Sequence, residues 1–204
     1  MNKRGFFICI EGLDGSGKTT QAKILVKNLT KQGYEALYTA EPSNGKIGKF
    51  IRRYLHGEGR VSSVVEALLF AADRFEHVSE EISPALAEGK IVVSDRYVYS
   101  SMAYQGASGI NIDWIRMING YVLKPDLAIF IDVEPEVVLQ RIRRKKTIME
   151  DLKTQRMVRE VYLKLVEGGE LKRVDGNRTR ADLAKEILSV CLDALKMHHS
   201  IMPS

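Results

Sequence analysis

Residues 12–19 read Gly12-Leu13-Asp14-Gly15-Ser16-Gly17-Lys18-Thr19 and match the phosphate-binding pattern GxxxxGK[ST]. The match has the context that its chemistry requires, because a buried-strand pattern at Phe6–Ile10 precedes it and a helical pattern at 18–32 follows it. Glycines allow successive N–H groups to turn inward around phosphate oxygens, and the amino end of the helix adds partial positive charge. Lys18 can reach the β- and γ-phosphates, and the Thr19 hydroxyl can bind Mg²⁺. The motif therefore predicts that the chain binds a nucleoside triphosphate.

A glycine-rich turn can match this pattern by chance, but the flanking strand and helix argue against that alternative. The motif by itself does not distinguish kinases, GTPases and motor ATPases. The chain carries no NKxD-type motif for guanine, and its 204 residues are few for a motor or ABC-type ATPase. A small chain with this motif favours phosphoryl transfer to a second small molecule.

Apolar runs and helical patterns alternate along the whole chain. They predict strands at 6–10, 34–39, 91–93, 127–131 and 171–174, and helices at 18–32, 47–55, from about 63, 135–144, 151–166 and 181–197. This alternation predicts a three-layer α/β fold, in which a five-stranded parallel sheet is covered by helices on both faces. Ligands of such sheets bind at the carboxyl ends of the strands. No repeat or linker divides the sequence, so we expect a single domain over residues 1–204.

The composition excludes several classes of protein. The hydrophobic fraction of 45% is too high for a disordered chain, and no apolar run is long enough to span a membrane. The first apolar run is short and ends at Glu11 without the cleavage site of a secretion signal. The two cysteines, Cys9 and Cys191, lack CxxC spacing and predict buried thiols in a reducing cytoplasm.

A second anionic site is predicted at the end of the strand at 91–93. Asp95 and Arg96 follow this buried strand, so both should emerge at the ligand-binding edge of the sheet. Asp95 can hold Mg²⁺ or orient an acceptor phosphate, and Arg96 can grip that phosphate with its fork of donors. A structural ion pair at the strand end is the alternative that remains open.

Two helices add candidates for the acceptor site. Arg52, on the helix beyond Glu41-Pro42, is a candidate second phosphate clamp, with a solvated basic face as the alternative. In the helix from about 63, Phe70 and Arg74 are one turn apart and lie off the predicted core stripe. A ring beside a guanidinium suits a planar base, although a subunit contact or an incidentally exposed ring is also compatible. The predicted core stripe of that helix consists of Val65, Leu69, Ala72 and Glu76.

Eight segments, spread over nearly the whole chain, follow one another in a characteristic order and spacing. They are Glu11-Gly12-Leu13-Asp14-Gly15-Ser16-Gly17-Lys18-Thr19-Thr20-Gln21, Glu41-Pro42, Leu69-Phe70-Ala71-Ala72-Asp73-Arg74, Asp95-Arg96-Tyr97, Ala103-Tyr104-Gln105-Gly106, Pro125-Asp126-Leu127, Asp132-Val133 and Val158-Arg159-Glu160-Val161-Tyr162-Leu163. In this order and spacing the chain resembles the thymidylate kinase family. The resemblance implies an enzyme that uses ATP and Mg²⁺ to convert dTMP to dTDP, usually as a homodimer.

The resemblance also implies the roles of single residues. Residues 12–19 would bind ATP, with Lys18 in a catalytic role. Asp14 and Asp95, together with Thr19, would organise Mg²⁺ and the acceptor phosphate, while Arg96 and Arg52 would hold the phosphate of dTMP.

The acceptor-binding region implied by the resemblance spans about 41–106. Phe70 would stack on thymine, Arg74 would hydrogen-bond its edge, and Tyr104 would lie under the deoxyribose. Ser101 stands where some relatives carry Asn and is expected to make a polar contact. The remaining candidates for substrate contact are Glu41 and Gln105.

A basic run, Arg141-Ile142-Arg143-Arg144-Lys145-Lys146, follows the fourth strand and its helix. Considered alone, it predicts a solvated face or a nucleic-acid patch, whereas the family resemblance implies a short lid over ATP at about 141–151. Because the interior of the P-loop lacks a basic residue, Arg143 and Arg144 would neutralise the transferred phosphoryl group. Arg141 would stack on adenine. The run holds five basic residues, which equals the net charge of +5, so ATP rather than nucleic acid is the expected polyanion.

Two other functions remain open at this point. A kinase for another deoxynucleotide or a deoxynucleoside fits the same P-loop. A non-catalytic nucleotide-binding regulator or nucleic-acid module would be expected to carry a broken P-loop or aromatic residues among its basic ones. The chain instead retains Lys18, Thr19, Asp95 and Arg96, and its basic run contains no aromatic residue.

Overall fold

The computed structural model describes residues 5–56, 62–141 and 151–201 of the 204-residue chain. Among these residues, five strands form one sheet in the order β2-β3-β1-β4-β5, and every neighbouring pair is parallel. The strands are β1 (Phe6–Gly12), β2 (Ala36–Ala40), β3 (Ile91–Asp95), β4 (Leu127–Asp132) and β5 (Lys172–Asp175). The predicted five-stranded parallel sheet is therefore confirmed.

The register of the sheet brings two predicted site segments together. Ile10 of β1 lies opposite Asp95 of β3, and Gly12 lies opposite Ile131 of β4. Because β1 runs into the loop at 12–19, that loop and Asp95 meet at the carboxyl edge of the sheet, where ligands of parallel sheets bind.

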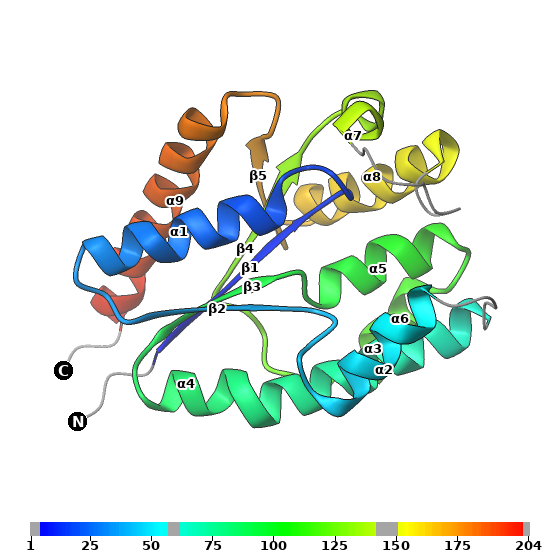
Figure 1. Ribbon diagram of the computed structural model, residues 1–204, viewed down its shortest axis with the longest axis horizontal. Coiled ribbons are helices and arrows are strands. Elements are labelled where there is room, and N and C mark those ends of the chain that lie inside the picture. The colour runs from blue at the N-terminus through cyan, green and yellow to red at the C-terminus, as the bar shows by residue number, and fades with distance from the viewer. Residues whose placement is uncertain (1–4, 57–61, 142–150, 202–204) are drawn as a thin grey trace.

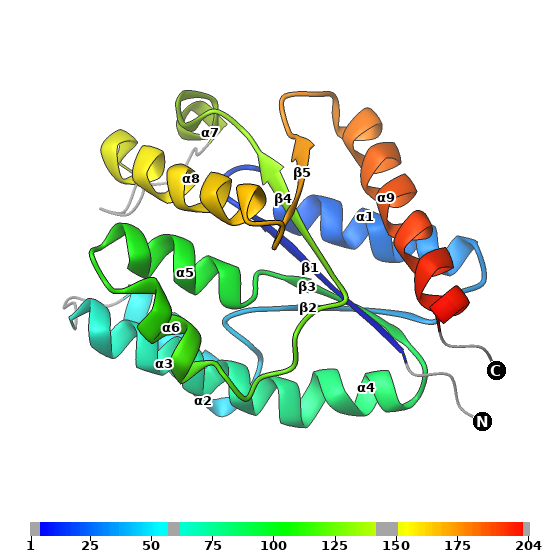
Figure 2. The ribbon, with the colours of Figure 1, turned by 180° about the vertical axis from the view of Figure 1, so that it is seen from behind.

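Helices cover both faces of the sheet (Figures 1 and 2). One layer consists of α1 (Lys18–Lys31) and α9 (Arg180–Ile201), which pack together. On the other face, α4 (Ser83–Ala87), α5 (Val98–Ala107) and α8 (Leu152–Glu167) contact strands. The predicted three-layer α/β fold is thus confirmed. No helix within the described ranges is long and apolar enough to cross a membrane.

Further helices lie outside this second layer (Figure 2). α3 packs on α5 and on α2, α6 contacts α5 and α3, and α7 contacts α8. A π-helical segment, η1, connects α3 to α4. The bounds are α2 (Lys46–His56), α3 (Ser63–His77), η1 (Val78–Ile82), α6 (Ile112–Ile118) and α7 (Pro135–Arg141). The helices α5 and α6 are additional to those that the sequence pattern predicts.

The buried face of α3 differs from the predicted core stripe. Val65 is 40% exposed, whereas Arg74, which was expected off the stripe, is 1% exposed. The prediction was wrong because polar side chains on this face find partners in other segments, so their burial does not leave them unpaired. The buried polar residues of α3 are Glu66, Asp73, Arg74 and His77.

Candidate active site

The loop between β1 and α1 has a backbone that glycine makes possible. Gly15 and Gly17 have φ values of 87° and 96°, in the left-handed region that other residues rarely adopt. A Cβ atom at Gly12 would lie 2.7 Å from Ser16 Oγ and 2.9 Å from Ile131 O. Gly17 is the N-cap of α1, so the loop leads directly into the amino end of that helix. This geometry is suited to a polyphosphate.

Lys18 is a buried cation at the start of α1. Its side chain is 6% exposed, and Nζ donates a hydrogen bond to Leu13 O at 2.8 Å. Asp14 Oδ1 lies 3.9 Å from the same nitrogen. Burial, together with the positive charge of Arg96, lowers the pKa of Lys18 to about 8. The nearby carboxylates therefore compensate the buried positive charge only in part. The phosphates of a nucleotide would supply the remaining negative charge.

Thr19 and Asp95 place a hydroxyl and a carboxylate side by side at the edge of the cleft. The Thr19 hydroxyl donates to Asp95 Oδ2, and Asp95 Oδ1 is buried and accepts no hydrogen bond from the residues that the structure describes. Mg²⁺ in phosphoryl-transfer sites is usually bound by one or two carboxylates together with substrate phosphates. The unpartnered carboxylate oxygen and the adjacent hydroxyl therefore fit a Mg²⁺ site.

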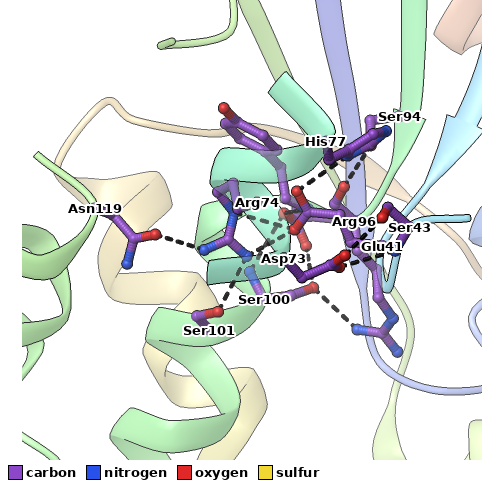
Figure 3. Close-up of polar contacts among 12 residues, drawn as sticks. Glu41, Ser43, Asp73, Arg74, His77, Ser94, Arg96, Ser100, Ser101 and Asn119 are labelled. Atoms are coloured by element: carbon purple, nitrogen blue, oxygen red, sulfur yellow. Dashed lines mark hydrogen bonds and ion pairs between the residues drawn. The ribbon is translucent and has the colours of Figure 1, made fainter. Parts of the chain in front are cut away.

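Arg96 follows β3 with a strained backbone. Its φ of 75° makes it the one non-glycine residue with positive φ in the described ranges. Nη1 donates to Ser100 Oγ at 2.9 Å (Figure 3), and Nη2 forms an ion pair with Asp14. The guanidinium also lies 5.1 Å from the centroid of the Tyr104 ring, whose hydroxyl accepts from Asp14 N at 3.1 Å. Tyr104, Asp14 and Arg96 are thus in direct contact.

Lys18, Asp95 and Arg96 line a cleft of about 300 Å³ at the carboxyl edge of the sheet. Arg141, at the end of α7, joins the P-loop in this lining. Arg143 and Arg144 lie outside the described residues, as do 142–150 of the expected lid. The lining residues are Asp14, Gly15, Gly17, Lys18, Thr19, Thr20, Asp95, Arg96 and Arg141.

Glu11 supports this edge from within the protein. It accepts hydrogen bonds from Tyr97 N at 2.8 Å, from Ser100 Oγ at 2.6 Å and from the Tyr162 hydroxyl at 3.0 Å. Burial raises the pKa of its carboxyl group. The residue ties β1 to α5 and α8, and through Ser100 it is connected to Arg96.

A second polar cluster surrounds Arg74 (Figure 3). Nε and Nη2 donate to Glu41 Oε2 at 3.0 and 2.7 Å, and Nη2 also donates to Ser101 Oγ at 3.1 Å. Nη1 donates to Asn119 Oδ1 at 2.7 Å. Glu41 Oε1 in turn lies 3.3 Å from His77 Nδ1. The structure therefore brings Glu41, Arg74 and Ser101 together, as the sequence-based assignment to one acceptor region expects.

Three other candidates lie around these clusters. Phe70 is half-buried, one turn before Arg74 on α3. Gln105 is buried on α5, and its Oε1 accepts no hydrogen bond within the described part of the chain. Arg52 donates to Pro42 O and to Asn44 Oδ1, so in this structure it holds the loop after β2.

Sequence reasoning missed two members of the Arg74 cluster. His77 is three positions after Arg74 on the same helix, and this spacing was the available signal. Asn119 is 45 positions from Arg74 and lies outside the predicted acceptor region, so no local pattern indicated it.

Comparisons with known proteins show the family of this chain. A model of the thymidylate kinase family matches residues 10–187. A probable thymidylate kinase of Pyrococcus horikoshii is 45% identical over 196 residues, which cover 92% of this chain and 96% of the relative. One of Thermococcus gammatolerans is 42% identical over 198 residues, covering 91% and 95%. The thymidylate kinase of Shouchella clausii is 40% identical over 195 residues, covering 89% and 92%. The chain belongs to the thymidylate kinase family.

Proposed function

We propose that the chain converts dTMP to dTDP by direct in-line transfer of the γ-phosphoryl group of ATP. Phosphorylation of dTMP in nucleotide biosynthesis is the activity of the family to which the chain belongs. The observation that carries the mechanism is the single cleft that joins Lys18 and Thr19 of the P-loop to Asp95 and Arg96 of the neighbouring strand.

The donor side is built from the P-loop. Residues 12–19 bind the triphosphate, and Lys18 contacts the β- and γ-phosphates. Thr19, Asp95 and Asp14 hold Mg²⁺, which when bound neutralises charge on the phosphates. Arg141, Arg143 and Arg144 belong to the proposed lid, where Arg141 stacks on adenine and the other two face the transferred group. The unpartnered Asp95 Oδ1 supports this assignment.

The acceptor side is built from α2, α3 and α5. Arg96 and Arg52 hold the 5′-phosphate of dTMP, which requires Arg52 to turn from its contact with Pro42 O. Phe70 stacks on thymine, Arg74 donates to the edge of the base, and Tyr104 lies under the deoxyribose. Glu41 orients Arg74, and Ser101 and Gln105 provide polar contacts in the same pocket.

The reaction needs no general base on the acceptor. The attacking oxygen of dTMP belongs to a phosphate that is already ionised at neutral pH, so positioning and charge neutralisation lower the barrier. Buried Lys18 and half-buried Arg96 serve this purpose, because a cation acts more strongly where water is excluded.

The enzyme acts as one domain and as a homodimer in the cytoplasm. Apolar side chains exposed on α2 and α3, two helices that pack on each other, support the dimer, because exposed apolar surface can mark subunit contacts. They are Phe50, Leu55, Val64, Val65, Leu68 and Phe75. Leu68→Glu should therefore give a monomer by sedimentation velocity, and an unchanged dimer would exclude this face.

Cys9 and Cys191 are buried free thiols, in keeping with a reducing compartment.

Coupled measurement of ADP release tests the proposed reaction. ATP and Mg²⁺ are supplied with dTMP, dUMP, dCMP, dGMP or thymidine as the acceptor, and dTMP should give the highest kcat/KM. Strong preference for a purine monophosphate, or for the unphosphorylated nucleoside, would refute the proposal. ADP release without any acceptor measures the background hydrolysis.

A further inference from the structure

The guanidinium of Arg74 has little freedom left. Arginine carries five N–H donors, and Arg74 uses four of them within the described part of the chain: two on Glu41, one on Ser101 and one on Asn119. Nη2 and Nε are fully used, so the donor that remains is the second N–H of Nη1. Since Arg74 is 1% exposed, this single N–H is the donor through which it can contact a substrate base.

Asn119 controls the nitrogen that carries this donor. Its Oδ1 accepts from Nη1 at 2.7 Å, while its own Nδ2 donates to Ile115 O at 2.8 Å (Figure 3 shows the first contact). The two contacts fix which end of the carboxamide faces Arg74, because an oxygen is needed on one side and an N–H on the other. The two hydrogens of Nη1 are held at a fixed angle in one plane, so placing one of them also directs the other.

The support of Asn119 is itself rigid. The residue is the C-cap of α6, and its backbone N–H donates to Arg116 O at 3.2 Å. Arg116 makes a two-pronged ion pair with Glu170, just beyond α8, at 2.8 and 2.6 Å. α6 also packs on α3 and α5, the helices that carry Arg74 and Ser101. A functional side chain is held more accurately when the residue that orients it is packed in this way.

We propose that Asn119 is a positioning residue for base selection, which aims the free N–H of Arg74 at the carbonyl oxygen on the edge of the acceptor pyrimidine. This inference rests on the proposed function, in which Arg74 contacts the base. Thymine and uracil carry a carbonyl at position 4, whereas cytosine carries an amino group there, which cannot accept a hydrogen bond. A correctly aimed single donor therefore favours dTMP over dCMP, and a guanidinium that can turn discriminates less.

Substitutions at Asn119 test this role in the full-length enzyme. Asn119→Leu removes the acceptor at similar volume and should raise KM for dTMP about tenfold, the loss expected for a hydrogen bond to a charged group. KM for ATP should be unchanged, kcat should stay within about twofold, and the preference for dTMP over dCMP should fall about tenfold. Asn119→Asp keeps an oxygen toward Arg74 and should give a KM and a preference nearer to wild type. If Asn119→Leu does not fold, Asn119→Ala removes the same acceptor with less volume and should show the same rise in KM and loss of preference, so wild-type values in it would equally overturn the inference.

A matched control lies at the other end of the same helix. Asn111 is the N-cap of α6, and its Oδ1 accepts from Trp114 N at 3.0 Å. Asn111→Ala should lower the melting temperature while leaving KM and base preference unchanged. Wild-type KM and preference in folded Asn119→Leu would overturn the inference, as would the same losses in Asn111→Ala, because weakening of α6 would then explain them. Failure of the wild-type enzyme to phosphorylate dTMP would contradict the proposed function instead.

Discussion

The buried ammonium of Lys18 should make ATP binding dependent on pH. Burial lowers its pKa to about 8, and a bound triphosphate raises that pKa again because it places negative charge beside the ammonium. The nucleotide therefore binds the protonated form more tightly. It follows that ATP binding takes up a proton above pH 8 and that affinity falls as the pH rises through this value.

The size of the effect follows from the two protonation states. With a pKa of about 8 in the free enzyme and about 10 in the complex, the association constant should fall roughly 20-fold between about pH 7.5 and 9.5. Phosphates of ATP are fully ionised over this range, so they contribute no comparable change. Tyrosines and cysteines of the site region do not interfere, since burial raises the pKa of Tyr104, Tyr162 and Cys9.

Isothermal titration calorimetry measures both quantities without an acceptor present. Titrations near pH 9 in buffers of different ionisation enthalpy should show uptake approaching one proton per ATP bound. Lys18→Arg is the matched control, because a guanidinium stays protonated throughout this range and should give a nearly constant affinity. A wild-type affinity that is constant with pH, or the same decline in Lys18→Arg, would refute the reasoning.

Three substitutions test other parts of the site. Tyr162→Phe keeps the ring stacked on Phe130, with centroids 4.7 Å apart, but removes a donor to Glu11. The free energy of unfolding in urea should fall by about 1–3 kcal/mol, and an unchanged value would show that this contact contributes nothing. Phe70→Ala should raise KM for dTMP by about 5- to 150-fold through loss of base stacking, with KM for ATP as the internal control, and unchanged dTMP affinity would remove the stacking assignment. Arg96→Ala should nearly abolish turnover in protein that is folded by circular dichroism, whereas full activity would contradict its role.

Local sequence was sufficient for most of the fold. Each observed strand overlaps a predicted one, and β1, β3 and β4 were the clearest because buried parallel strands are short apolar runs bounded by polar residues. α5 was missed because it is buried on several sides and therefore shows little helical periodicity. The strand order β2-β3-β1-β4-β5 depends on pairing between distant segments, which a pattern in one window does not contain.

The same distinction applies to the site. The meeting of the P-loop with Asp95 could be predicted, because parallel strands end at one edge and Ile10 lies opposite Asp95. The contact between Arg74 and Asn119 could not be predicted, because it joins residues 45 positions apart through the packing of α6 on α3.

α3 buries polar side chains and exposes apolar ones, and this arrangement is explained better by function than by stability. An ion pair such as Arg74 with Glu41 loses its hydration on burial, and replacing such a pair with apolar residues is often neutral or stabilising. A chain that only had to fold would gain more by turning Leu68 and Phe75 inward, yet these side chains are exposed. The arrangement is accounted for if the polar face holds a guanidinium for the acceptor base and a second copy covers the apolar face.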